Sequence, residues 1–182
     1  VTQRTGPASR AACAAVFLGI AGASSAQDAP AETSPTISTW DGQRFETTNP
    51  ELAAAAVVFA TPSGERTLGW HRVRDIQGAD AAAAADLLAF GRTVWRATTR
   101  LDRGDSFGAE PLFESAFERT RGSVGPTPAV VADGLLRCRL RRDARAAAFD
   151  AWLELAANLA VAPARNPQWG LRSPAVDTKT RL

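Results

Sequence analysis

The sequence predicts a mainly helical α+β fold, in which a small N-terminal antiparallel β unit precedes two helix pairs. Three observations lead to this prediction. Residues 37–77 contain short runs of strand-forming residues separated by turn residues. Residues 79–162 instead repeat their apolar residues at steps of three and four, as one face of an α-helix does. A loop rich in glycine and proline at 122–128 divides this helical region into two parts.

The first predicted hairpin lies near the start of residues 37–77. It runs from Thr39 to Phe45 and turns at Asp41-Gly42, a pair that is typical of two-residue hairpin turns. Further along, residues 51–59 contain four consecutive alanines, so a helical turn is an alternative to a strand there.

The second predicted hairpin places residues 57–61 opposite a return strand at 66–76, with the turn at residues 62–65. Together the hairpins predict one sheet of three or four strands. Such a small sheet is not stable alone. We therefore expect it to pack on the helices or to pair with another chain.

The first helix pair surrounds a short turn at Gly104 and Asp105. Asp80 is a suitable cap for a helix over residues 80–101, and the alanines that follow it are strong helix formers. Glycine closes that helix and aspartate caps the next one, which is predicted over residues 106–120. Because the turn is short, we expect the two helices to pack antiparallel.

The second helix pair is predicted at residues 129–142 and 145–162. A constant offset, the one that leads from Leu101 to Leu140, superposes the first pair on the second and indicates two tandem units. The same offset relates Arg103 to Arg142, Ala109 to Ala148, and Phe113 to Trp152. The residues predicted to be buried between the pairs are Phe90, Val94, Leu112, Phe113, Leu135, Trp152 and Leu153.

The second predicted helix resembles part of a tetratricopeptide repeat. Gly104, Ala109, Phe113 and Ala116 have the small, small, aromatic, small spacing of that family, and the run from Ala109 to Phe113 looks like the repeats of kinesin light chains. The resemblance implies that Pro111 is tolerated near the first turn of this helix. It also implies a stack of helices whose concave face binds peptides or partner proteins.

Residues 1–26 are typical of a cleavable signal peptide. Two arginines precede a short apolar run over residues 11–22, and the small residues that follow predict cleavage after Ala26. The apolar run is shorter than the ~20 residues that a spanning helix needs, so we expect export to the periplasm or the exterior without membrane insertion. Residues 27–36 are predicted to form a flexible leader and residues 163–182 an irregular tail.

Charge argues against a nucleic-acid partner. The chain has 21 basic and 19 acidic residues, and removal of the signal peptide takes away Arg4 and Arg10, which leaves equal numbers. A nucleic-acid-binding protein would need a net basic surface.

No catalytic or cofactor motif is present in the sequence, so we predict a protein that is not an enzyme and needs no cofactor or metal. His71 is the only histidine, and a single histidine makes no metal site alone. Cys138 is the only cysteine beyond the signal peptide, so it forms no internal disulfide. The flanking Arg137 and Arg139 would favour its thiolate, but we interpret it as an inert helix residue.

The predicted function is therefore a binding scaffold whose helical face recognises a peptide or partner protein. Arginines recur along the predicted helices and can dock acidic segments through charge-assisted hydrogen bonds. For the arginines of the first predicted helix, the alternative is a solvent-exposed helix face that is partly paired with Glu110, Glu114 and Glu118. An alternative function is a structural component that assembles through the small β unit; the oligomeric state is left open. The predicted partner-binding residues are Arg92, Arg96, Arg100, Arg103, Arg137 and Arg141.

Overall fold

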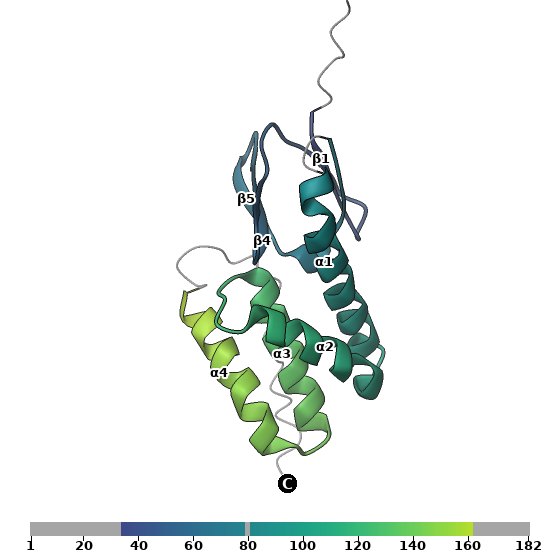
Figure 1. Cartoon of the computed structure of the whole chain (residues 1–182), viewed down its shortest axis with the longest axis vertical. Helices are drawn as coiled ribbons and strands as arrows, with labels where there is room; N and C mark the ends of the chain where they lie inside the picture. Colours follow the sequence, from purple (N-terminus) through teal and green to yellow (C-terminus); the bar gives the residue numbers. More distant parts are fainter. Residues whose placement is uncertain (1–33, 79–80, 162–182) are drawn as a thin grey trace, which may run out of the picture. The chain divides into compact units, whose positions relative to one another are not determined.

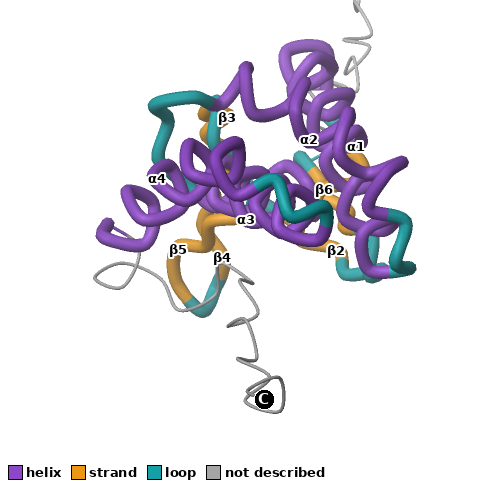
Figure 2. The backbone as a smooth tube through the Cα atoms, turned by 90° about the horizontal axis from the view of Figure 1, so that it is seen from below, coloured by secondary structure: helices purple, strands orange, loops and turns teal. Residues whose placement is uncertain are grey.

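The computed structural model describes residues 34–78 and 81–161, and it confirms a mainly helical α+β fold with the strands before the helices (Figure 1). The predicted signal peptide, the predicted tail at 163–182 and most of the predicted leader lie outside the described residues. The strands are β1 (Thr36–Thr39), β2 (Arg44–Glu46), β3 (Glu51–Ala53), β4 (Ala56–Thr61), β5 (Gly64–Leu68) and β6 (Val73–Gln77), with a 3-10 turn η1 (Trp70–Arg72) before β6. The helices, purple in Figure 2, are α1 (Ala81–Asp102), α2 (Ser106–Thr120), α3 (Pro126–Arg141) and α4 (Arg145–Val161).

The strands form two antiparallel three-stranded sheets rather than the single predicted sheet. In the first sheet, ordered β2-β1-β6, the predicted first hairpin is present, with Gly42 at a φ of 84° in its turn. In the second sheet, ordered β3-β4-β5, strands β4 and β5 form the second hairpin. Strand β3 pairs with β4, so a helical turn at residues 51–59 is wrong.

The predicted return strand at 66–76 is split at Trp70. Strand β5 ends at Leu68, and β6 joins the other sheet by pairing with β1. The backbone N–H of Trp70 donates to Thr127 Oγ1 of α3 at 2.8 Å, and its indole Nε1 donates to the Ala53 carbonyl at 2.8 Å. The buried tryptophan therefore connects the second sheet to the start of α3.

Helix α1 approaches the same tryptophan closely through Gly91. A Cβ atom at this position would lie 2.3 Å from the Trp70 carbonyl oxygen, so only glycine allows the approach. Ala84 of α1 also lies in the apolar core of the β unit, so this core continues onto the helix. The buried residues of this core are Ile37, Val57, Phe59, Leu68, Trp70, Val73, Ile76 and Ala84.

The helix boundaries follow local signals in the sequence. Helix α2 begins at Ser106, as predicted, because the Asp105 carboxylate accepts a hydrogen bond from the Gly108 N–H at 2.8 Å. Pro111 lies inside α2. Helix α3 begins at Pro126, three residues before its predicted start, since proline suits the first helical position.

The turns that close the two helix pairs share their hydrogen bonds at the offset that relates Leu101 to Leu140. In each turn, one residue has a positive φ, which is 88° at Gly104 and 56° at Asp143. In each pair, an arginine near the end of the first helix also donates to a carbonyl near the start of the second. The matched bonds are Gly104 N–H to Leu101 O (3.0 Å) and Asp143 N–H to Leu140 O (3.1 Å); Asp105 N–H to Arg100 O (3.0 Å) and Ala144 N–H to Arg139 O (2.9 Å); and Arg100 Nη1 to Gly108 O (3.5 Å) and Arg139 Nη1 to Ala147 O (2.6 Å).

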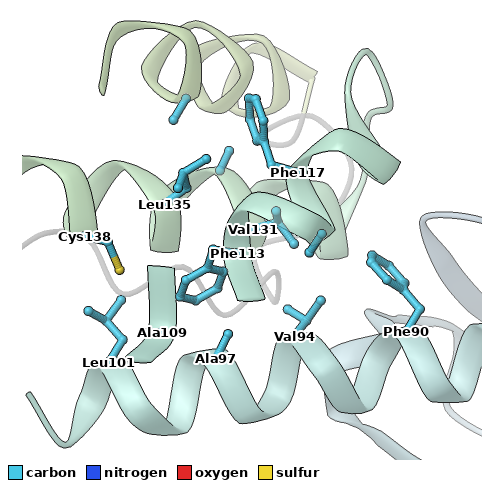
Figure 3. Packing of buried hydrophobic residues seen from close by; sticks show 13 residues of the cluster. Phe90, Val94, Ala97, Leu101, Ala109, Phe113, Phe117, Val131, Leu135 and Cys138 are labelled. Carbon is cyan, nitrogen blue, oxygen red and sulfur yellow. The ribbon is translucent and has the colours of Figure 1, made fainter. Parts of the chain in front are cut away.

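The helical core lies mainly between α1, α2 and α3 (Figure 3). Phe113 of α2 packs against Gly134 of α3, where a Cβ atom would lie 2.2 Å from the ring. Trp152 and Leu153 were predicted to be part of this core, which is wrong, because they are 50% and 46% exposed. The buried residues of the core are Phe90, Val94, Ala97, Leu101, Ala109, Phe113, Ala116, Phe117, Val131, Ala132, Leu135, Cys138 and Ala151.

Helix α4 contacts the rest of the chain through a side made of small and polar residues. Ala148, Ala151 and Asn158 are its buried residues. The Asn158 side chain accepts a hydrogen bond from the Gly125 N–H at 2.8 Å and donates to the Ser123 carbonyl at 3.4 Å. It thereby fixes the loop that leads into α3, and the large apolar residues of α4 are left on its other sides.

Candidate functional site

Three of the six predicted partner-binding arginines are exposed along α1 and its C-terminal end and form no ion pair within the described part of the chain. Arg92, Arg96 and Arg103 lie at steps of four and seven, which places them on one side of the helix. They cover a length of about 17 Å at the rise of an α-helix. Among the described residues, no carboxylate lies within 4.0 Å of these three guanidinium groups. This set is named here the α1 arginine face, and its guanidinium groups are free of direct ion pairs with the described residues.

The other three predicted arginines have local partners. Arg100 lies 3.4 Å from the Asp105 carboxylate, at the turn into α2. Arg137 lies 3.6 Å from Asp133 on its own helix. Arg141 donates a hydrogen bond to the Leu101 carbonyl at 3.5 Å, at the end of α1. Three of the six arginines are thus engaged by groups of the chain itself.

The glutamates expected to pair with the α1 arginines have other partners. Glu110 is buried and pairs with Arg142 and Arg139, which belong to the end of α3 and the turn after it. Glu114 lies 3.3 Å from Arg139, and Glu118 pairs with the arginine three residues further along the chain. The predicted pairing with the α1 arginines is therefore wrong, because Glu110 and Glu114 point toward the end of α3 and Glu118 pairs at the end of its own helix.

Arg139 is the most enclosed arginine of this cluster, with 16% of its side chain exposed. Its Nη1 donates to the Ala147 carbonyl at 2.6 Å and its Nη2 to Glu114 at 3.3 Å. Its buried Nε lies 4.0 Å from Glu110, which is too far for a hydrogen bond. The cluster therefore links α2, α3 and the start of α4 by charge, and we interpret it as structural.

Helix α1 is held firmly where it carries the arginine face. Trp95 stacks on Trp40 of the β unit, with ring centroids 4.2 Å apart and an interplanar angle of 13°. On α2, Arg119 lies 2.5 Å from Asp86 and 4.6 Å from the centroid of the Phe90 ring. These contacts attach α1 to the β unit and to α2.

A second surface, on α4, was not expected from the sequence. Phe149, Trp152, Leu153 and Leu159 are all exposed large apolar residues, and the rings of Phe149 and Trp152 stack with centroids 5.7 Å apart. Exposed apolar groups of this size on one helix are typical of interaction sites. The sequence pattern predicts that two of these residues, Trp152 and Leu153, are buried, whereas the structure exposes both.

Two further features of the described residues are a histidine with a buried ring nitrogen and a polar hollow. His71 packs over Gly69 with its Nδ1 buried and without a hydrogen-bond partner, and burial followed by the charge of Arg72 lowers the pKa of His71 to about 4. It is therefore neutral at pH 7. A polar hollow of about 230 Å³ over the first sheet is lined by Arg44, Arg74 and their neighbours. In the described part of the chain, no three histidine, cysteine or acidic side chains come together as metal ligands.

Cys138 is expected to react much more slowly than a free cysteine. Its side chain is fully buried, and this burial, followed by the negative charge of Glu110, raises the pKa of its thiol to about 11 against the opposing arginines. The thiolate is the reactive form, so at pH 8 the folded chain should react with a thiol reagent at least ~100-fold more slowly than a cysteine peptide. Thiol-labelling kinetics in buffer and in denaturant provide the measurement and its control. Equal rates for native chain and peptide would contradict the expectation.

Comparison of the chain with models of known protein families, with curated proteins and with solved structures finds no match. Among the described residues, none of the helices combines the length and the apolar character that crossing a membrane requires.

Proposed function

We propose that the protein is an exported, non-enzymatic binding scaffold that recognises an acidic segment of a partner protein on the α1 arginine face. The observation that carries this proposal is the exposure of Arg92, Arg96 and Arg103, which form no ion pair with the described residues. Guanidinium groups form strong charge-assisted, often bidentate, hydrogen bonds with carboxylates. A rigid helix presents them in a fixed row, which lowers the entropic cost of binding.

The tetratricopeptide resemblance supports the same proposal from another direction. Helical-repeat proteins bind peptides or partner proteins on the face of a stack of helices. In this chain, the hydrogen bonds of the first turn recur in the second turn at a constant offset, as tandem units would have them. Assembly through the β unit remains the alternative. Each sheet has two edge strands: β2 and β3 have three residues each, and short edge strands resist pairing with other chains, whereas β5 and β6 have five residues each.

Affinity capture from the exported fraction of the source cell tests the proposal. The full chain is compared with a triple variant, Arg92→Glu, Arg96→Glu and Arg103→Glu. A captured partner should bind the triple variant about 100-fold more weakly, because attraction becomes repulsion at three positions. Binding to the native chain should also weaken as salt rises.

The matched control carries the same change of charge on the β unit, at Arg44, Arg66 and Arg74. This variant should retain the partner as well as the native chain does. If the partner binds the α1 variant and the native chain equally, or if salt has no effect on its binding, the arginine face is not the binding site and the proposal fails.

A further inference from the structure

The side of α4 that points away from α3 carries a continuous apolar seam. Phe149, Leu153, Ala156 and Ala160 follow one another at steps of four, three and four, which is the spacing of a coiled-coil contact line. Phe149 is 55% exposed, and Leu153 is nearly half exposed. This set of four residues, named here the α4 seam, is exposed at Phe149, Leu153 and Ala160 and half-buried at Ala156.

The seam is divided into a half with large residues and a half with small ones. Phe149 and Leu153 are large, whereas Ala156 and Ala160 are small. A two-fold axis between Glu154 and Leu155 would place Phe149 opposite Ala160 and Leu153 opposite Ala156 of a second, antiparallel copy. Every large residue of the seam then meets an alanine, so the seam is complementary to itself.

We propose that α4 is a self-association surface, on which the α4 seam packs against the same seam of a second copy of this chain. Pairing by a two-fold axis is the commonest arrangement of soluble oligomers. In an antiparallel pair, the helix macrodipoles run in opposite directions and attract each other weakly. This proposal does not depend on the arginine face of α1.

Packing elsewhere in the chain uses the same large-to-small principle. The ring of Phe113 on α2 is buried because α3 presents Gly134 to it. At the offset between the two helix pairs, α4 corresponds to α2, and Trp152 corresponds to Phe113. The half-exposed Trp152 is therefore the counterpart of a side chain that is buried within the chain.

The neighbours of the seam agree with a two-fold pairing. Trp152 and Leu159 lie seven residues apart on the same flank, so Trp152 of one copy comes near Leu159 of the other. The charged residues beside the seam, Arg145 and Asp150, both lie in the N-terminal part of α4. Antiparallel pairing would separate Asp150 from its copy by about 13 Å along the helix axis, and Arg145 by more, so neither residue meets its own copy.

The available area suits a modest dimer. A fully buried aromatic side chain covers about 150 to 250 Å², so the exposed parts of the large α4 residues amount to roughly 500 Å² per copy. Two copies would bury about 1,000 Å², which is near the lower limit for a specific interface. We therefore expect dissociation constants in the micromolar range, about 10⁻⁶ to 10⁻⁴ M.

A size exchange across the two-fold axis tests the proposal, with sedimentation equilibrium of the full chain as the measurement. Leu153→Ala should weaken the dimer at least about tenfold, because a buried leucine is lost. Adding Ala156→Leu to this variant should restore the dimer. The large side chain at position 156 then faces the alanine at position 153 of the other copy. The pair Phe149→Ala and Ala160→Phe provides the same test at two exposed positions, where folding is not at risk. Leu140→Glu, at an exposed apolar residue of α3, is the control and should leave the dimer intact.

Three outcomes would overturn the proposal. The first is a chain that stays monomeric at every concentration up to the millimolar range. In that case another segment or a different partner would cover the apolar surface of α4. The second is a dimer that Leu153→Glu does not weaken, which would place self-association on another surface such as the sheet edges. The third is a loss of the dimer that neither exchange restores in folded variants, which would exclude the two-fold register.

Discussion

Replacing Trp70 with alanine is expected to lower the free energy of unfolding by about 3 to 5 kcal/mol, as is typical for a buried tryptophan. The indole is fully buried, and its Nε1 donates to the Ala53 carbonyl at 2.8 Å. The substitution leaves a cavity between the second sheet, α1 and α3, and it leaves that carbonyl without its donor. Because small domains are stable by only about 5 to 15 kcal/mol, a large part of the total stability depends on this side chain.

Urea unfolding followed by circular dichroism measures the loss. Trp152→Ala is the matched control, since it makes the same chemical change at a half-exposed position. It should cost less than about 1 kcal/mol when the chain is monomeric. Equal losses for the two variants would mean that Trp70 does not hold the β unit to the helices.

Much of the fold could be predicted because its signals are local. The start of α2 depends on Gly104 and Asp105, which act within one turn of chain, and its bounds were predicted correctly. The partner of β6 depends instead on which distant strand it meets, and a local pattern does not carry that information. The split at Trp70 has the same cause, because the tryptophan is placed by contacts with Thr127 and Gly91 rather than by its neighbours in sequence.

The candidate surfaces could be predicted only in part. The arginine periodicity on α1 correctly indicated an exposed side for Arg92, Arg96 and Arg103. It could not show that Glu110 and Glu114 are turned toward α3, because that depends on the angle between helices. Helix α4 has two apolar sides, one with large residues and one with alanines. Because alanine allows close packing between helices, the alanine side can be the buried side. The sequence pattern favoured the larger residues, and Ala148 and Ala151 are buried instead.

Glu110→Gln is expected to destabilise the chain by about 2 kcal/mol, between the cost of breaking a buried ion pair and that of losing an exposed one. The substitution keeps the volume of the side chain and removes its charge, which leaves Arg139 and Arg142 with less compensation. Removing one partner of a fully buried ion pair typically costs about 3 to 5 kcal/mol. We expect less here, because Arg142 is 40% exposed and Arg139 keeps its contact with Glu114.

Glu118→Gln is the matched control for this charge removal, since Glu118 lies on the same helix but pairs with Arg121 at the exposed surface. Its cost should be below about 0.5 kcal/mol and should vanish in high salt, as for other exposed ion pairs. The cost of Glu110→Gln should persist in high salt, because the Glu110 carboxylate is shielded from the solvent ions. Urea unfolding of both variants at low and high salt measures this difference. If the two glutamates respond to substitution and to salt in the same way, then the Glu110 cluster does not join α2 to α3, and the packing of Phe113 against Gly134 must hold the two helices together without it.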